Sequence, residues 1–242
     1  MAIDETRRLK VLELVGVVWT DGVTERLSRL SLSTRPGEIL GLIGPTGGGK
    51  SSALAVMAGA VVPTRGRLVW EGTDISRKPA RLHAHTGLTT HELPGPTDVT
   101  VDEWLSLFAS LDEVSAERLG GRQNVLSALG IEGLLERKVS TLSRGERRRM
   151  ALARVSLRRP RLFLLDGPAD GLDGLGLRQV TACVKEAASS GSTVVLTAVA
   201  PHLPTSLCDR VLVISGGAVV AEHLRTAPQF AASVAGALGW GS

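Results

Sequence analysis

Aromatic residues are scarce in this sequence: they make up 3% of its 242 residues, and tyrosine is absent. The only two cysteines, Cys183 and Cys208, lie in apolar-leaning segments and lack the spacing of metal ligands. We therefore expect two buried, reduced thiols and no disulfide framework or zinc site. Because no aromatic residues are interleaved among the basic ones, the sequence has no stacking platform for bases, and we expect no nucleic-acid partner.

Long apolar runs are missing as well. A membrane-spanning helix needs roughly 18–20 consecutive apolar residues, whereas apolar runs such as Val11–Val18 and Leu162–Leu165 have the length of strands. The N-terminus, Met-Ala-Ile-Asp-Glu, lacks the apolar segment of a secretory signal. We therefore expect any work at a membrane to depend on another protein that carries the chain there. The net charge of +4 permits anionic partners without indicating one.

The hydrophobic pattern alternates between strand-like and helix-like stretches. Short apolar or alternating segments predict strands at 11–18, 27–33, 38–43, 66–71, 87–90, 162–166, 193–197 and 210–214. Helical spacing predicts helices at 51–60, 143–157 and 173–188, and within 101–137. Such alternation indicates a parallel sheet with crossover helices. The simplest arrangement is one domain, 1–225, whose α/β core (1–90 and 150–225) is interrupted by a helical insert (91–149). We draw nothing from the tail 226–242.

A glycine-rich loop follows the expected strand 38–43. Gly44-Pro-Thr-Gly-Gly-Gly-Lys50-Ser51 satisfies every specified position of the nucleotide-binding pattern G-x-x-x-x-G-K-[ST]. Glycines let successive backbone N–H groups wrap phosphates, and the following helix N-terminus adds a partial positive charge. The alternative, a glycine-rich turn that binds nothing, leaves the complete motif in its strand–helix context unexplained. The candidate nucleotide-binding residues are Gly44, Pro45, Thr46, Gly47, Gly48, Gly49, Lys50, Ser51 and Ser52.

A carboxylate ends the apolar segment Arg161-Leu-Phe-Leu-Leu-Asp166. In proteins with such a loop, an aspartate at this place holds Mg²⁺, often through water, and the loop hydroxyl is a second ligand. An aspartate at a strand end is also a common turn former. Downstream of a complete phosphate loop, we expect Ser51 and Asp166 to hold Mg²⁺.

The segment Leu142-Ser-Arg-Gly-Glu146 resembles the signature motif of ABC ATPases, usually written LSGGQ. Pro36-Gly-Glu38, Gly171-Leu-Asp173 (similar to the D-loop) and Cys208-Asp-Arg-Val211 extend the resemblance over about residues 9–223. The sequence is thus identified as a member of the ABC transporter nucleotide-binding domains. The resemblance implies a P-loop (RecA-like) parallel-sheet core with an N-terminal antiparallel β subdomain and a helical insert. It also implies ATP and Mg²⁺ as ligands.

The signature segment has two interpretations. Ser143-x-x-Glu146 is a capping box, with which many helices begin without binding a ligand. The resemblance implies more, because in the family the signature of one subunit closes over the γ-phosphate held by the facing subunit. Ser143 and Gly145 would supply that contact here. The basic residues of this region are interpreted as solvated helix faces: Arg144, Arg147, Arg148, Arg149, Arg158, Arg159 and Arg161.

Four positions depart from the family's catalytic set. Gly167 stands where the family has a glutamate that polarises the attacking water, and Val199 stands at the switch histidine. The glutamine that senses Mg²⁺ and the γ-phosphate aligns with His91. The aromatic residue that stacks on adenine aligns with Asp21, so Trp19, two residues away, is the candidate replacement.

These losses affect hydrolysis more than binding. A positioned general base contributes roughly 10²–10⁴ in rate, and neither Gly167 nor Val199 can act as one. The loop that binds phosphate is intact. Asp170 and His202, each three residues beyond a lost group, are candidate surrogates. Because catalysis is sensitive to displacements of about 1 Å, we interpret Asp170 as a loop carboxylate and His202 as a surface residue.

The leading hypothesis is an ATP-binding subunit of an ABC transporter, peripheral on the cytoplasmic face of the cell membrane. It would pair with transmembrane subunits and with a second, catalytically complete ABC ATPase in a heterodimer, and would itself hydrolyse little or no ATP. A regulatory pseudo-ATPase that gates a partner without transport is an alternative. So is a homodimeric ATPase that uses surrogate residues, or a soluble ABC ATPase of translation or DNA repair. Neither the transported substrate nor its direction follows from the sequence.

Overall fold

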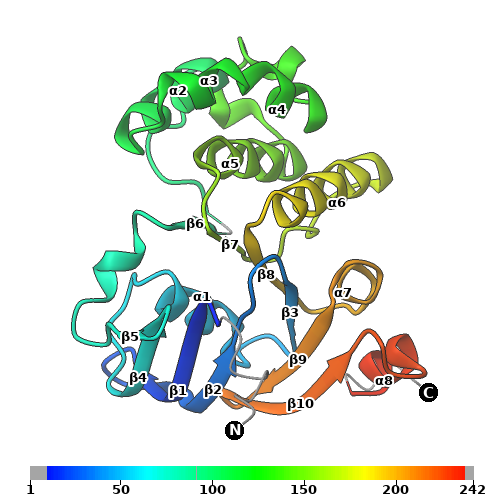
Figure 1. Cartoon of the computed structure of the whole chain (residues 1–242). Coiled ribbons are helices and arrows are strands. Elements are labelled where there is room, and N and C mark those ends of the chain that lie inside the picture. Colours follow the sequence, from blue (N-terminus) through cyan, green and yellow to red (C-terminus); the bar gives the residue numbers. More distant parts are fainter. Residues whose placement is uncertain (1–9, 91, 238–242) are drawn as a thin grey trace, which may run out of the picture.

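The structure is a computed structural model that describes residues 10–90 and 92–237 (Figure 1). Its centre is a six-stranded sheet of order β10-β9-β3-β8-β7-β6. The strands β3, β6, β7, β8 and β9 are mutually parallel, and β10 pairs antiparallel with β9 at the edge. Their bounds are β3 Ile39–Ile43, β6 Thr86–Thr89, β7 Leu162–Leu165, β8 Thr193–Ala198, β9 Arg210–Ser215 and β10 Ala218–Leu224.

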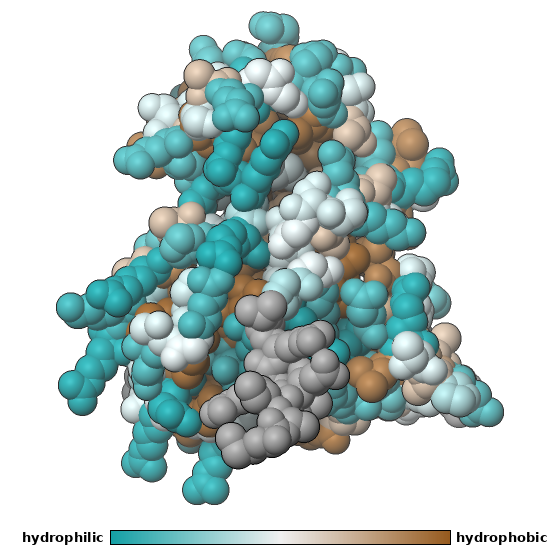
Figure 2. All heavy atoms as spheres, viewed as in Figure 1, coloured by the Kyte–Doolittle hydropathy of each residue, from teal (hydrophilic) through white to brown (hydrophobic). Residues whose placement is uncertain are grey.

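A second sheet is antiparallel, with order β2-β1-β4-β5. It comprises β1 Leu12–Thr20, β2 Glu25–Ser33, β4 Arg65–Trp70 and β5 Thr73–Asp74. Three of these strands come from the N-terminal segments that the sequence predicts. In Figure 2 hydrophilic side chains extend from the lower edge of this sheet and cover the outer helices. The fold class expected from the sequence, an α/β protein with a parallel core, an antiparallel β subdomain and helices, is confirmed.

Alternate residues of the central strands point to opposite faces of the sheet, and this alternation separates two cores. Leu162 and Leu164 of β7 pack with the helix α1 (Lys50–Met57) and the antiparallel sheet. Phe163 and Leu165 pack with the helices α5 (Arg144–Arg158) and α6 (Gly174–Ser189). The helix that follows the phosphate loop therefore lies on one face, and the signature helix lies on the other.

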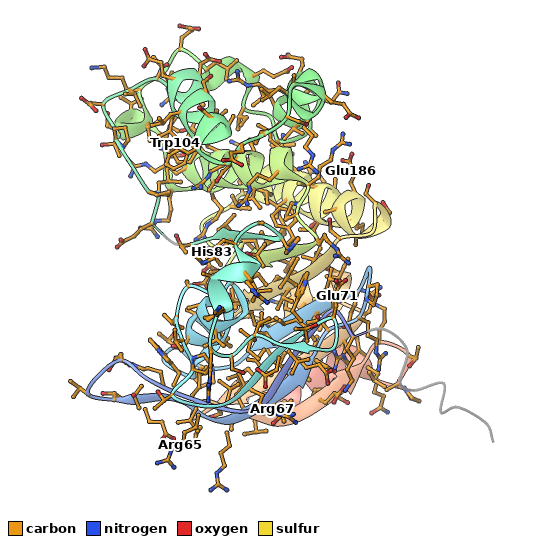
Figure 3. The ribbon with its side chains drawn as sticks, turned by 60° about the vertical axis from the view of Figure 1, so that its left-hand side comes forward. Arg65, Arg67, Glu71, His83, Trp104 and Glu186 are labelled. Carbon is orange, nitrogen blue, oxygen red and sulfur yellow. The ribbon has the colours of Figure 1, made fainter. Side chains whose placement is uncertain are left out.

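The helices between β6 and α5 form a separate layer above α5 (Figure 1). They are α2 Val101–Leu111, α3 Ala116–Gly120 and α4 Arg122–Ala128, with short 3₁₀ turns at Glu132–Leu134 and Val139–Thr141. Trp104, labelled in Figure 3, is fully buried between this layer and α5. Arg154 of α5 donates two hydrogen bonds to Asp112 and lies 4.0 Å over the ring of Phe108, which fixes the layer to α5.

Several elements were not predicted from the sequence, among them the short strand β5 and the following ones. A short helix α7 (His202–Leu207) contains Pro204, the edge strand β10 (Ala218–Leu224) follows β9, and α8 (Phe230–Ala237) buries Phe230 and Val234 in the core. A 3₁₀ turn at Pro79–Leu82 precedes β6. Both cysteines are buried and unpaired, as expected. Within the described residues no helix is long and apolar enough to cross a membrane.

A buried ion pair fixes the start of β3 to β9. The Arg210 guanidinium donates to both Glu38 carboxylate oxygens at 2.7 and 3.1 Å, and the two side chains are only 7% and 6% exposed. The same guanidinium reaches Glu222, whose side chain is 48% exposed. Removing one partner of a buried pair leaves an uncompensated charge, which is costly.

We therefore expect Glu38→Ala to lower the free energy of unfolding by about 3–5 kcal/mol, as breaking a buried pair does. Glu222→Ala is the matched control, because it removes a half-exposed partner of the same arginine and should cost about 1 kcal/mol or less. Urea denaturation of the two variants measures the difference. Equal losses would show that burial of the Glu38–Arg210 pair is not what matters.

Candidate nucleotide-binding site

The glycine-rich loop connects β3 to α1 at the carboxyl ends of the parallel strands, where α/β proteins bind ligands. Gly44 has φ +148°, and a Cβ there would lie 2.0 Å from the Ile214 carbonyl oxygen. Gly49 is the N-cap of α1 with φ +105°, and its Cβ would lie 2.9 Å from the Arg26 carbonyl oxygen. Only glycine fits at these two positions, so the loop is held against β9 and β2 by its own backbone.

Lys50 is folded back into the loop. Its buried Nζ donates to the carbonyl oxygens of Gly44 and Pro45, each at 2.8 Å. Burial lowers the pKa of the Lys50 ammonium, while the nearby carboxylates of Asp166 and Asp170 act in the opposite direction. The loop therefore combines a glycine cradle, a helix N-terminus and a lysine ammonium, a donor set that fits the phosphates of a nucleotide.

Gly44→Ala is expected to abolish ATP binding, because the added methyl cannot share space with the Ile214 carbonyl and the loop must move away from β9. Gly47→Ala is the matched control within the loop. Gly47 also has a positive φ of +78°, but a Cβ there meets nothing within 4 Å. Titration calorimetry with MgATP should show no heat for Gly44→Ala and affinity within about tenfold for Gly47→Ala, since a left-handed alanine costs roughly 1–2 kcal/mol. Equal ATP affinities of the two variants would show that the close approach of Gly44 to the Ile214 carbonyl is not needed for binding.

Asp166 follows β7 and is buried at the same edge of the sheet as Lys50. Its Oδ1 accepts a 2.6 Å hydrogen bond from the Thr197 hydroxyl at the end of β8, and that hydroxyl oxygen accepts from the Gly167 amide at 2.8 Å. Ser51 is exposed in the first turn of α1. A serine hydroxyl and a carboxylate are hard oxygen ligands of the kind Mg²⁺ prefers. These residues therefore fit the metal that accompanies a nucleotide phosphate.

Gly167 and Val199, where the family's catalytic glutamate and switch histidine are missing, lie just after β7 and β8. Gly167 is buried with φ +55°, directly after Asp166, and has no side chain to present to a water. Val199 follows β8 and is 45% exposed. Asp170 lies in a turn in which its amide donates a hydrogen bond to the Gly167 carbonyl at 3.1 Å. His202 begins α7 and is exposed.

Trp19 and Asp21, the two candidates for the position beside adenine, lie at the connection between β1 and β2. Trp19 is half-buried on β1, and its partner on β2, Leu27, contacts the loop at Gly49. Asp21 closes the turn between these strands by accepting hydrogen bonds from the Thr24 and Val23 amides and from Arg26. These contacts, the Thr24 amide above all, lower the pKa of Asp21 to about 2. His91, the remaining candidate, lies outside the described residues.

The signature segment forms the predicted capped helix. The Ser143 hydroxyl accepts from the Glu146 amide at 3.2 Å, and the Glu146 carboxylate accepts from the Ser143 amide at 2.7 Å. The first turn of α5 contacts the loop before α6, since a Cβ on Gly145 would lie 3.2 Å from the Gly171 carbonyl oxygen. Ser143 is exposed, so the helix N-terminus is open to a ligand from outside the chain.

The interpretation of the basic run as solvated helix faces is wrong for several arginines. Arg148 is buried, and its Nη1 donates to the Asp166 carbonyl at 2.6 Å. Arg149 donates to the Leu129 and Gly130 carbonyls and to the Gln179 side chain, and Arg158 donates to the Thr86 and His83 carbonyls. These arginines connect α5 to the site and to neighbouring elements.

The fold and the site define the class of protein: an ATP-binding domain with a phosphate loop on one face of the sheet and a signature helix on the other. The family model for ABC transporters matches residues 27–170. The chain belongs to the ABC transporter ATP-binding family, whose domains use ATP, normally with Mg²⁺.

Relatives span different transport systems. The chain is 33% identical over 217 residues to the ABC transporter ATP-binding/permease protein Rv1747 of Mycobacterium tuberculosis, covering 87% of this chain and only 25% of that protein. It is 34% identical to the zinc import ATP-binding protein ZnuC 2 of Hahella chejuensis (78% and 72% covered). It is 30% identical to the lipopolysaccharide export system ATP-binding protein LptB of Escherichia coli K12 (81% and 83% covered). A solved ATP-binding subunit of an ABC transporter has the same fold, with a TM-score of 0.80 at 22% identity over 88% and 90% of the chains.

Proposed function

We propose that this chain is a degenerate ATP-binding subunit that works head to tail with a second, catalytically complete ABC ATPase. The observation that carries the proposal is Gly167, which follows the Mg²⁺-site aspartate in an otherwise intact phosphate site. With no carboxylate there and an exposed Val199 at the switch position, the chain binds ATP and hydrolyses almost none. In this account residues 1–225 form the ATP-binding domain, with the helical insert at 91–149, and 226–242 form a C-terminal tail whose helix α8 packs Phe230 and Val234 against that domain.

The phosphate loop and the N-terminus of α5 then have different functions. The loop with Lys50, Ser51 and Asp166 holds one ATP with Mg²⁺ and keeps the dimer closed. The N-terminus of α5, with Ser143 and Gly145, is offered to the ATP on the facing subunit, and hydrolysis occurs there. This division is supported by the capping box of α5, which keeps Ser143 exposed at the start of the helix with Gly145 in its first turn.

We infer transmembrane partners for this chain from the transport systems of its relatives. ZnuC 2 and LptB are ATP-binding proteins of an import and an export system, so we propose that this chain also docks on transmembrane subunits at the cytoplasmic face of a membrane. The helical layer and the segment around His91 would face them. The direction and cargo of transport differ between such relatives, and they are not part of the proposal.

Affinity capture of the tagged chain from detergent-solubilised membranes of its host tests this function. The expected result is co-purification of polytopic membrane proteins and of a second ABC ATPase that carries glutamate at the position of Gly167. Recovery with soluble partners alone would support a regulatory pseudo-ATPase instead. Recovery as a homodimer whose ATP hydrolysis is abolished by Asp170→Asn or His202→Ala would support surrogate catalysis. Either result would overturn the proposal.

A further inference from the structure

The last glycine of the phosphate loop, Gly49, is enclosed by two segments from other parts of the chain. A Cβ on Gly49 would lie 2.9 Å from the Arg26 carbonyl oxygen at the start of β2 and 3.0 Å from the Gly217 Cα. The Gly217 amide in turn donates to the Gly48 carbonyl at 3.0 Å. A single sugar joins the base of a nucleotide to its phosphates. When the phosphates fill this loop, the base therefore lies against a segment beside it.

Of these two segments, the start of β2 is the one with side chains that contact a base. The connection between β9 and β10 consists of Gly216 and Gly217 and presents only backbone. At the start of β2, the Arg26 side chain is 47% exposed, and its Nε donates to the Asp21 Oδ2 at 2.6 Å. The guanidinium of Arg26 is therefore the charged planar group next to this end of the loop.

The position of the Arg26 guanidinium is fixed through Asp21. The Asp21 Oδ1 accepts from the Thr24 amide at 2.9 Å and from the Val23 amide at 3.2 Å, so the turn holds the carboxylate. The Thr24 amide and the Arg26 side chain lower the pKa of Asp21 to about 2, which keeps it ionised at neutral pH. Nη1 and Nη2 of Arg26 form no hydrogen bond with any residue that the structure describes. Asp21 thus holds the guanidinium at one edge and leaves the rest to a ligand.

The ring of Trp19 is held differently. Trp19 is the only aromatic residue of β1 and β2. It is half-buried and packs against the hydrophobic core between the antiparallel sheet and α1. An indole that turned toward a base would lose this packing, whereas Arg26 keeps its bond to Asp21 while a base lies on it.

We propose that Arg26, held by Asp21, is the platform on which the base of the bound nucleotide stacks. This inference rests on the proposed function, because it concerns the nucleotide in this chain's own phosphate loop. An ion pair would then replace the aromatic ring that the family has at the position of Asp21. A guanidinium is planar and stacks on aromatic faces. Since every base has such a face, stacking discriminates little between bases, and the ligand class is purine nucleoside triphosphates rather than ATP alone.

The test is titration calorimetry of the isolated chain with three magnesium-bound ligands: ATP, GTP and inorganic tripolyphosphate, which has no base. The unaltered chain should bind ATP and GTP within about threefold of each other. Arg26→Ala should weaken both nucleotides about fivefold to tenfold, the range of a lost stacking contact. Its affinity for tripolyphosphate should stay within about twofold, which shows that the loop is still folded.

Arg67→Ala is the matched control for this loss of charge. Arg67 is exposed on β4 and pairs with Val15 of β1, at a distance along the strand from the turn at Asp21 (Figure 3). Its affinities for all three ligands should equal those of the unaltered chain.

Two further variants separate the plane of the guanidinium from its charge. Arg26→Lys keeps the charge and loses the plane, so it should weaken the nucleotides as much as Arg26→Ala does. Asp21→Asn keeps an oxygen for the amides of the turn but breaks the ion pair with Arg26. It should weaken both nucleotides about twofold to fivefold and leave tripolyphosphate unchanged.

Four results would overturn the inference. Equal losses for ATP and tripolyphosphate in Arg26→Ala would assign the arginine to a phosphate. Unchanged ATP affinity in Arg26→Ala, with a loss in Trp19→Leu, would assign the base to the indole, and no loss in either would exclude both side chains. A preference for GTP above about tenfold that Arg26→Ala removes would show hydrogen bonding to the edge of guanine instead of stacking. All four leave the proposed function standing, whereas failure of the unaltered chain to bind any of the three ligands would overturn both.

Discussion

The double substitution Gly167→Glu with Val199→His is expected to raise the ATPase turnover of the isolated chain by about 10–1000-fold. A positioned general base contributes roughly 10²–10⁴ in rate, and position 167 directly follows the Asp166 carboxylate that is held by Thr197. Part of the gain is lost, because Gly167 has φ +55° and a glutamate in the left-handed region costs about 1–2 kcal/mol. Phosphate release at high protein concentration, where two copies can face each other, is the measurement.

The control for this gain is Gly167→Ala with Val199→Ala. It introduces the same backbone strain at 167 and removes the same valine, but supplies neither a carboxylate nor an imidazole. If the two double variants release phosphate at the same rate, the absence of these two groups is not what limits hydrolysis.

Lys50→Met is expected to weaken MgATP binding by about 10–100-fold. The substitution keeps an unbranched apolar stem and removes the ammonium that is held between the Gly44 and Pro45 carbonyls. A charge-assisted hydrogen bond contributes about 1.5–3 kcal/mol, which corresponds to that range. Titration calorimetry of MgATP gives the two dissociation constants directly.

Lys185→Met is the matched control, since Lys185 is exposed on the far part of α6 and carries the same charge. Its dissociation constant for ATP should equal that of the unaltered chain. A Lys50→Met protein that binds ATP as tightly as this control would mean that nucleotide sits elsewhere.

Short sequence motifs correctly predicted those structural features that depend on residues close together in the chain. The capping box Ser143–Glu146 correctly predicted the start of α5, and Asp173, where the predicted helix 173–188 begins, is the N-cap of α6. The phosphate loop likewise lies between a buried strand and a helix, because the glycines that define the motif are the residues its backbone requires.

Features that depend on distant contacts were missed. Arg148 was interpreted as solvated because a basic run usually is, but it lies three, four and seven residues before Ala151, Leu152 and Val155, which are buried. That spacing places it on the inner face of α5, and only the fold shows its partner, the Asp166 carbonyl 18 residues away. The helix α7 was missed because it is six residues long and contains Pro204.

The most direct test of the central claim measures ATP binding and ATP turnover in one sample of the isolated chain. The account predicts saturable MgATP binding that requires Lys50, with phosphate release no faster than from a Gly44→Ala protein. Turnover of about 1 per second or more, which is ordinary for an enzyme, would contradict it and show that the site at Gly167 hydrolyses ATP without its glutamate.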